Sequence, residues 1–121
     1  MKHFFQKLFS SIRNTQPLKY GCNPNQTATI SNNPFQIING QPSYINMLDA
    51  LTSWQLVNEI NSITNQVVAT SFKHVTPTGI ALADNSYNSY KLARNIDSKS
   101  SFGDFISISD TVDSHTANYI K

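Results

Sequence analysis

Apolar side chains recur at helical spacing in three segments of this sequence, which predicts three amphipathic helices. These segments are residues 1–16, including a short linker, 43–60 and 87–96. Ser43 can cap the long middle helix, and its wide apolar face predicts burial on more than one side. In the third helix, Lys91 and Arg94 are expected to face outward. Asp113 can cap a last helix, which is still running when the sequence ends.

Shorter runs rich in β-forming residues lie between the helical segments. They cover residues 28–30, 35–38, 67–72, 79–83 and 105–108. The run over 67–72 is uninterrupted, which is typical of a strand inside a covered sheet. Asn39-Gly40 predicts a turn after the second run. Strands that alternate with helices predict an α/β fold, with a short mixed sheet flanked by helices.

Composition and charge narrow the class of protein. A chain of 121 residues suits one domain or part of one, and a hydrophobic share of 39% is enough for a folded core. The net charge of +2 is small, and no basic stripe interleaved with aromatic residues is present, so nucleic-acid binding is not expected. Cys22 is the only cysteine, which excludes an intramolecular disulfide and favours a reducing, cytoplasmic location.

The first segment leaves three interpretations open. It carries Lys2, Lys7 and Arg13, and no acidic residue precedes Asp49. An acid-free amphipathic start is typical of a mitochondrial transit peptide or of a membrane-surface helix. The alternative, which we favour, is a helix that docks its aromatic stripe on the core. No apolar stretch of the sequence approaches the ~20 residues needed to span a bilayer, so a membrane protein is not expected.

Lys73 and His74 are the first candidates for chemistry. Histidine exchanges protons near neutral pH, and lysine offers a compact cation that stabilises negative charge. Neighbours in a regular strand point to opposite faces, so one ligand contacts both only where the strand bends. Pro77 and Gly79 make such a bend plausible, although a solvated lysine and a strand-capping histidine would give the same pattern.

A second candidate is the stretch around Phe102 and Gly103. The glycine would let the backbone approach a ligand, and the phenyl ring offers a face for a flat heterocycle. A simple turn before a strand is the alternative. His3 and His115 are isolated in the sequence, and no cluster of ligands at metal-binding spacing predicts a metal site.

Five stretches considered together resemble one known family. They are LKYGCNPNQ (18–26), NGQPSYIN (39–46), LDAL with WQL (48–56), SFKHV (71–75) and SSFGDF (100–105). Their order and content resemble the AICAR transformylase/IMP cyclohydrolase bifunctional purine biosynthesis family. The resemblance assigns residues 17–121 to the N-terminal portion of the transformylase domain, and residues 1–16 to the end of the cyclohydrolase domain.

The resemblance implies a partial cytidine-deaminase-like domain and formyl transfer from 10-formyltetrahydrofolate to AICAR, with no metal. By residue-by-residue correspondence, His74 would accept the proton of the attacking amine, and Lys73 would orient that amine and stabilise charge. Five residues would contact the nucleotide: Lys19, Tyr20 and Gly21 at the phosphate and ribose, and Phe102 and Gly103 at the heterocycle.

Departures from the family pattern imply a loss of catalysis. Asn25 stands where the family has a histidine that assists the active site, and Lys19 replaces a more usual arginine. The chain also ends before the second deaminase-like subdomain and most of the folate pocket. We therefore expect a truncated homologue that is inactive alone. The alternative is a non-catalytic protein that binds AICAR or a related purine nucleotide, a full-length homologue or a second copy of itself.

Overall fold

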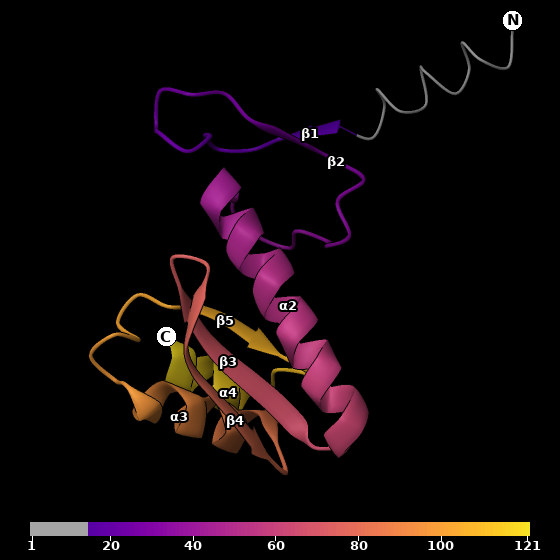
Figure 1. Ribbon diagram of the computed structural model, residues 1–121, viewed down its shortest axis with the longest axis vertical. Coiled ribbons are helices and arrows are strands. Elements are labelled where there is room, and N and C mark those ends of the chain that lie inside the picture. Colours follow the sequence, from indigo (N-terminus) through magenta and orange to yellow (C-terminus); the bar gives the residue numbers. More distant parts are fainter. Residues whose placement is uncertain (1–14) are drawn as a thin grey trace, which may run out of the picture. The chain divides into compact units, whose positions relative to one another are not determined.

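The computed structural model describes residues 15–121, which divide into two compact units after Met47. The predicted N-terminal helix falls on residues 1–14, outside the described residues. Figure 1 shows the order of the elements along the chain.

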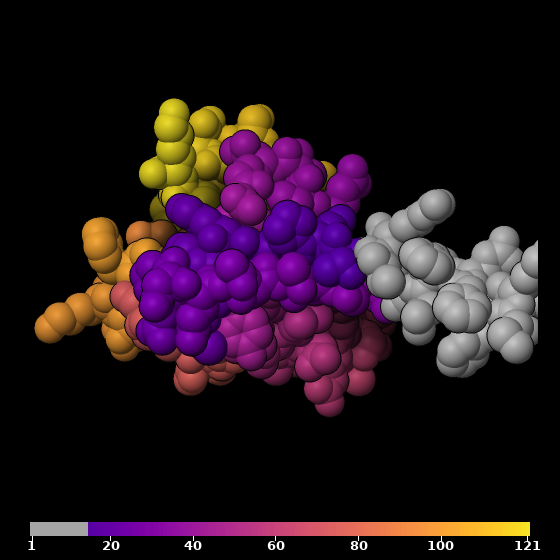
Figure 2. Space-filling model, turned by 90° about the horizontal axis from the view of Figure 1, so that it is seen from above, coloured from indigo at the N-terminus to yellow at the C-terminus, as the bar shows by residue number. Residues whose placement is uncertain are grey.

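The first unit contains a two-stranded antiparallel sheet of β1 (Thr15–Pro17) and β2 (Thr29–Ser31). The predicted strand at 28–30 is thus confirmed with a shift of one residue. The strand predicted over 35–38 is wrong, because this segment pairs with no strand and the Ile38 side chain is 91% exposed. Most side chains of the unit are exposed, and they form the indigo and purple surface in Figure 2.

Helix α2 (Tyr44–Thr64) begins where the sequence predicts. The Ser43 hydroxyl accepts the Asn46 N–H, and the Asn46 side chain accepts the Ser43 N–H, so the two residues form a reciprocal N-terminal cap. From Leu48 onward the helix belongs to the second unit. There, one row of residues four apart is buried: Asp49, Ser53 and Val57.

The second unit is built on a three-stranded sheet in the order β4-β3-β5, formed by β3 (Val67–Lys73), β4 (Thr76–Ala83) and β5 (Phe105–Ile108). The expectation of a mixed sheet is wrong, because β3 pairs antiparallel with both neighbours. A tight turn joins β3 to β4, and the chain then crosses over β3 to form β5 on its other side (Figure 1). Strands β4 and β5 therefore run parallel to each other without pairing.

Helices cover both faces of this sheet. The Ser107 hydroxyl of β5 hydrogen-bonds with that of Ser53 on α2. On the opposite face, a Cβ added to Gly79 of β4 would lie 2.0 Å from the carbonyl oxygen of Ala93, so α3 (Ser86–Ile96) packs directly on the backbone. Coverage on both sides explains why Val68 through Phe72 are all buried, as the uninterrupted run predicted.

The ends of α3 and of α4 (Ser114–Ile120) follow local sequence signals. Asn85 caps α3, and Asp113 caps α4 as predicted, by accepting the Thr116 N–H at 2.7 Å. Lys91 is exposed as expected. Arg94 is not directed outward: its guanidinium donates to the Tyr90 hydroxyl at 2.9 Å, and its side chain is only 30% exposed.

Candidate active site

The candidate pair Lys73 and His74 lies at the tip of the β3–β4 hairpin. Lys73 pairs with Thr76, which leaves His74 and Val75 as the two central residues of the turn. Their φ angles are 54° and 61°, both in the left-handed region, as in a type I′ hairpin turn. This conformation costs an L-residue roughly 1–2 kcal/mol, and it is most unfavourable for a β-branched side chain such as valine. The tip is therefore a strained turn.

A β-bulge lies directly below the tip. Ser71 pairs with Gly79 and Phe72 pairs with Pro77, so Thr78 is an extra residue on β4. The Thr78 hydroxyl donates to the Ser71 carbonyl at 3.0 Å, which holds the bulge in place. Bulges re-aim side chains near functional sites. The bend that Pro77 and Gly79 suggested in the sequence is thus present as a bulge between them.

The hairpin tip contacts the loop that contains Phe102 and Gly103. The Lys73 ammonium donates a hydrogen bond of 2.7 Å to the Phe102 carbonyl. The Phe102 ring is 77% exposed, and Gly103 has a φ of 70° with open space where a Cβ would stand. The fold thus brings together two of the stretches that the sequence singled out, 29 residues apart.

A buried polar network supports this contact from below. The Ser71 hydroxyl donates to the Asp104 carboxylate at 2.6 Å and lies 2.9 Å from the Ser101 hydroxyl. The Thr78 hydroxyl is within 2.9 Å of Ser71 and 3.2 Å of Ser101. Ser71 and Ser101 are fully buried. Because buried polar groups are costly unless paired, this network specifies one arrangement of strand, bulge and loop.

Helix α3 closes the network on its far side. The Tyr90 hydroxyl donates to Asp104 at 3.1 Å and accepts from Arg94, whose guanidinium lies 3.9 Å from the same carboxylate. Burial raises the pKa of Tyr90 to about 12. The hydrogen bond with Tyr90 raises the pKa of Arg94, which keeps the guanidinium charged at any ordinary pH. Asp104 thus joins the strand, the loop and the helix.

A second carboxylate contacts the tip itself. Oδ1 of Asp49, on α2, accepts the backbone N–H of Val75 at 2.8 Å. Asp49 is 5% exposed and lies in the buried row of α2 described above. The strained turn is therefore connected to a helix 26 residues earlier in the chain.

The remaining candidates lie in the first unit, on one continuous segment. The N–H of Lys19 donates to the Pro42 carbonyl, the Tyr20 carbonyl accepts the N–H of Tyr44, and the N–H of Gly21 donates to the Gln26 carbonyl. These bonds hold the backbone of the segment from two sides. The Lys19 side chain is exposed, and its ammonium lies 6.0 Å from the centre of the Tyr20 ring.

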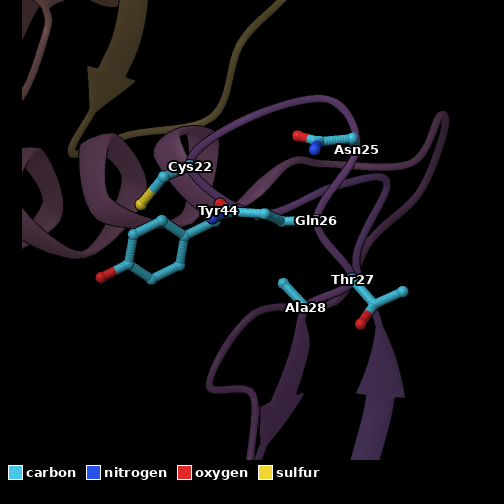
Figure 3. A pocket seen from close by; sticks show the side chains of 7 residues that line it. Cys22, Asn25, Gln26, Thr27, Ala28 and Tyr44 are labelled. Carbon is cyan, nitrogen blue, oxygen red and sulfur yellow. The ribbon is translucent and has the colours of Figure 1, made fainter.

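An open pocket of about 580 Å³ lies beside this segment. Figure 3 shows its lining from the loop between β1 and β2 and from the first residue of α2. The lining residues are Gly21, Cys22, Asn25, Gln26, Thr27, Ala28 and Tyr44. Two of the candidates, Gly21 and Asn25, therefore share one surface, whereas Lys19 and Tyr20 do not line it.

The described residues, 15–121, contain no group of three or more histidine, cysteine, aspartate or glutamate residues placed to hold a metal ion. None of the helices in this range is both long and apolar enough to cross a membrane.

Comparison with known proteins decides the family. The family model described as the AICARFT/IMPCHase bienzyme matches residues 1–121. The chain belongs to this family. It is 34% identical over 116 residues to the bifunctional purine biosynthesis protein PurH of Clostridium botulinum and to that of Clostridium beijerinckii, which covers 88% of the chain and 22% of each relative. For PurH of Thermoanaerobacter sp., the identity is 34% over 111 residues, with 84% and 21% covered.

The chain thus spans about a fifth of the length of the relatives that it matches. In this AICARFT/IMPCHase member, the fold joins Lys73 to the Phe102 loop in one unit and places Lys19, Tyr20, Gly21 and Asn25 in the other. Asp49 and Asp104, whose carboxylates support the hairpin tip and the Phe102 loop, were not predicted from the sequence. One signal was available for Asp49, since an acidic residue stood on the apolar face of a predicted helix.

Proposed function

We propose that the chain carries part of the formyl-transfer site of its family and binds AICAR, or a closely related purine nucleotide, in the cytoplasm. The relatives are named for bifunctional purine biosynthesis, and the family model for an AICAR formyltransferase and IMP cyclohydrolase bienzyme. The observation that carries the proposal is the contact of Lys73 with the Phe102 loop, because it joins the two stretches that the family resemblance assigns to the reacting end of AICAR.

The residue types suit the proposed chemistry. The amine of AICAR is attached to an aromatic ring and is a weak nucleophile, so a positioned base is worth ~10²–10⁴-fold in rate. His74 is exposed at the tip and accepts a proton of the amine as the amine attacks the formyl carbon of 10-formyltetrahydrofolate. The bond between that carbon and N10 of the folate then breaks, and tetrahydrofolate leaves with a proton on N10. Lys73 holds the amine and carboxamide and stabilises the developing negative charge. The Phe102 ring provides a face for the heterocycle.

We further propose that Lys19, Tyr20 and Gly21 contact the phosphate and ribose, and that the second unit is a part of a cytidine-deaminase-like domain. The exposed ammonium of Lys19 supports the first assignment. The three-stranded sheet covered by helices on both faces supports the second. Asn25, which lines the pocket beside Gly21, lacks the imidazole that the family uses there.

We propose that these 121 residues by themselves do not transfer the formyl group. They match only about a fifth of the bifunctional relatives, and positioning contributes ~7–11 kcal/mol to a barrier only when the full geometry is held. Incubation with AICAR and 10-formyltetrahydrofolate should yield no formylated product. Turnover that disappears in His74→Ala would overturn this part of the proposal.

Calorimetric titration with AICAR tests binding directly. The wild-type chain should release or absorb heat with a saturable isotherm, and Lys73→Ala and His74→Ala should weaken the affinity by tenfold or more. Lys91→Ala is the matched control, because it removes an exposed lysine charge from α3 and should leave the affinity unchanged. An absence of binding by the wild-type chain would overturn the nucleotide-binding proposal.

An exposed apolar pair favours a second candidate function, association with a full-length homologue or with a second copy of the chain. Leu92 and Ile96 of α3 are 53% and 62% exposed, and their spacing places them on one helix face. Adjacent exposed apolar side chains are typical of protein contacts. Capture of a purified full-length PurH protein, abolished by Leu92→Glu/Ile96→Glu, would support this function. A monomeric chain in sedimentation that also captures no PurH would exclude it.

A further inference from the structure

The turn that presents the candidate pair has a sequence that opposes its own conformation. Two-residue turns with both φ angles positive favour Asn-Gly, Asp-Gly or Gly-Gly, because these residues enter the left-handed region at low cost. Here the two positions are His74 and Val75, with φ angles of 54° and 61°. A β-branched residue at positive φ persists only where the surrounding structure holds it there. Something outside the turn must therefore stabilise it.

Asp49 makes the contact that meets this requirement. Its Oδ1 accepts the Val75 N–H at 2.8 Å, so the bond acts on the most strained residue of the turn. The residue is 5% exposed and sits on a regular helix, so the acceptor is placed by rigid structure and is shielded from water. A hydrogen bond to a charged, buried acceptor is stronger than one between neutral groups. No other side chain of the described residues bonds to the backbone N–H groups of the turn.

We propose that Asp49 is a positioning residue, which holds the His74–Val75 turn in its left-handed form and thereby directs the Lys73 and His74 side chains to one ligand. The hairpin tip then has two attachments. The Lys73 ammonium is tied to the Phe102 carbonyl on one side, and the Val75 N–H is tied to Asp49 on the other. Without Asp49, Val75 is free to return to the negative φ that a valine favours, and the backbone that carries His74 rotates with it. The part of this inference that concerns the ligand rests on the proposed function.

The experiment compares three variants of the full chain by nuclear magnetic resonance. Asp49→Ala removes the acceptor, whereas Asp49→Asn retains an oxygen at the same place. Glu59→Ala is the matched control, because Glu59 is an exposed acid on the same helix and its side chain makes no contact with the turn. Two readouts are local to the turn: hydrogen exchange of the Val75 amide, and the intraresidue Hα–HN Overhauser effects of His74 and Val75, which are strong only at positive φ.

In Asp49→Ala, the Val75 amide should exchange about 10- to 100-fold faster, and the strong Overhauser effects of His74 and Val75 should be lost. Asp49→Asn should keep both Overhauser effects and most of the protection, and Glu59→Ala should match the wild type. The proposal is overturned if Asp49→Ala keeps the positive φ angles, or if Glu59→Ala loses them as well.

If Asp49→Ala fails to fold, the double variant Asp49→Ala/Val75→Gly tests the proposal instead. Glycine adopts positive φ without strain, so this change removes the need for an external acceptor. In the Val75→Gly background, Asp49→Ala should leave the chain folded, with the His74 resonances unchanged. A double variant that remains unfolded would show that Asp49 acts elsewhere in the core, which would overturn the proposal.

A titration with AICAR separates this inference from the proposed function. The His74 imidazole resonances of the wild type and of Asp49→Asn should shift on addition of AICAR. Those of Asp49→Ala should need an AICAR concentration at least tenfold higher to reach half of their full shift. If AICAR leaves the wild-type resonances unchanged, the nucleotide-binding proposal fails. The exchange rates and Overhauser effects then still decide whether Asp49 positions the turn.

Discussion

Replacing Asp104 by alanine removes the carboxylate that joins β3, the loop after α3 and α3 itself. Its side chain is 5% exposed, and it accepts hydrogen bonds from the Ser71 hydroxyl at 2.6 Å and from the Tyr90 hydroxyl at 3.1 Å. The change therefore affects a buried network rather than a surface charge. It acts directly below the hairpin that presents the candidate pair.

The two lost hydrogen bonds set the expected decrease in the free energy of unfolding. A hydrogen bond to a charged group contributes roughly 1.5–3 kcal/mol, so two of them give an upper range of roughly 3–6 kcal/mol. The loss is smaller in practice, because Ser71 keeps the Ser101 and Thr78 hydroxyls as partners and Tyr90 keeps Arg94. We expect the free energy of unfolding to fall by about 2–4 kcal/mol, a large share of the ~5–15 kcal/mol typical of a folded domain.

Urea denaturation followed by circular dichroism measures this loss as a shift of the unfolding midpoint. Asp104→Asn should lose about half as much as Asp104→Ala, since it keeps an acceptor oxygen but not the charge. Asp110→Ala is the matched control, because the side chain of this exposed aspartate accepts a hydrogen bond only from the adjacent backbone N–H of Thr111. The unfolding midpoint of this variant should stay close to that of the wild type. A midpoint for Asp104→Ala equal to that of the wild type would refute the reasoning. Equal losses for alanine and asparagine would show that the charge, and not an acceptor oxygen, stabilises the network.

Three further predictions concern the second unit. Gly79→Ala should lower the free energy of unfolding by about 1–3 kcal/mol in the same urea assay, because the new Cβ would lie 2.0 Å from the Ala93 carbonyl oxygen; an unchanged midpoint would contradict the packing of α3 on β4. Asn85→Ala should cost about 1 kcal/mol in thermal unfolding, because it removes the side chain that accepts the Asn88 N–H at 2.9 Å, and Asn85→Ser should recover most of the loss. Burial raises the pKa of Tyr90 to about 12, so the stability that this shift contributes is complete below the ordinary tyrosine pKa of ~10 and is lost as the pH rises from ~10 through ~12. Tyr90→Phe should therefore lose less stability than the wild type between those pH values in the urea assay. Identical pH profiles of the two proteins would contradict the pKa shift.

The elements whose signals are local were predictable from the sequence. Ser43 and Asp113 cap α2 and α4 as expected, because a short polar side chain satisfies the free N–H groups of the first turn in any tertiary setting. The apolar run of β3 likewise predicted a strand covered on both faces. The family resemblance, carried by five stretches in order, required no structure, and the family comparison confirms it.

The pairing of the strands was decided only by the tertiary structure. The sequence predicts that strands and helices alternate, but not which strands become neighbours. The crossover through α3 passes over β3, which makes every pair in the sheet antiparallel. The segment 35–38 shows the same limit, because β propensity without a partner strand does not form a strand.

The geometry of the candidate site was also beyond the sequence. Val75 disfavours a positive φ, so no local rule predicts the turn that it forms with His74. The turn exists because Asp49, 26 residues earlier, places a buried acceptor opposite the Val75 N–H. The sequence by itself identified Lys73 and His74 as the candidate pair and predicted where α2 and α4 begin. Long-range hydrogen bonds, which outweigh local backbone preference once they are buried, determined how Lys73 and His74 are presented.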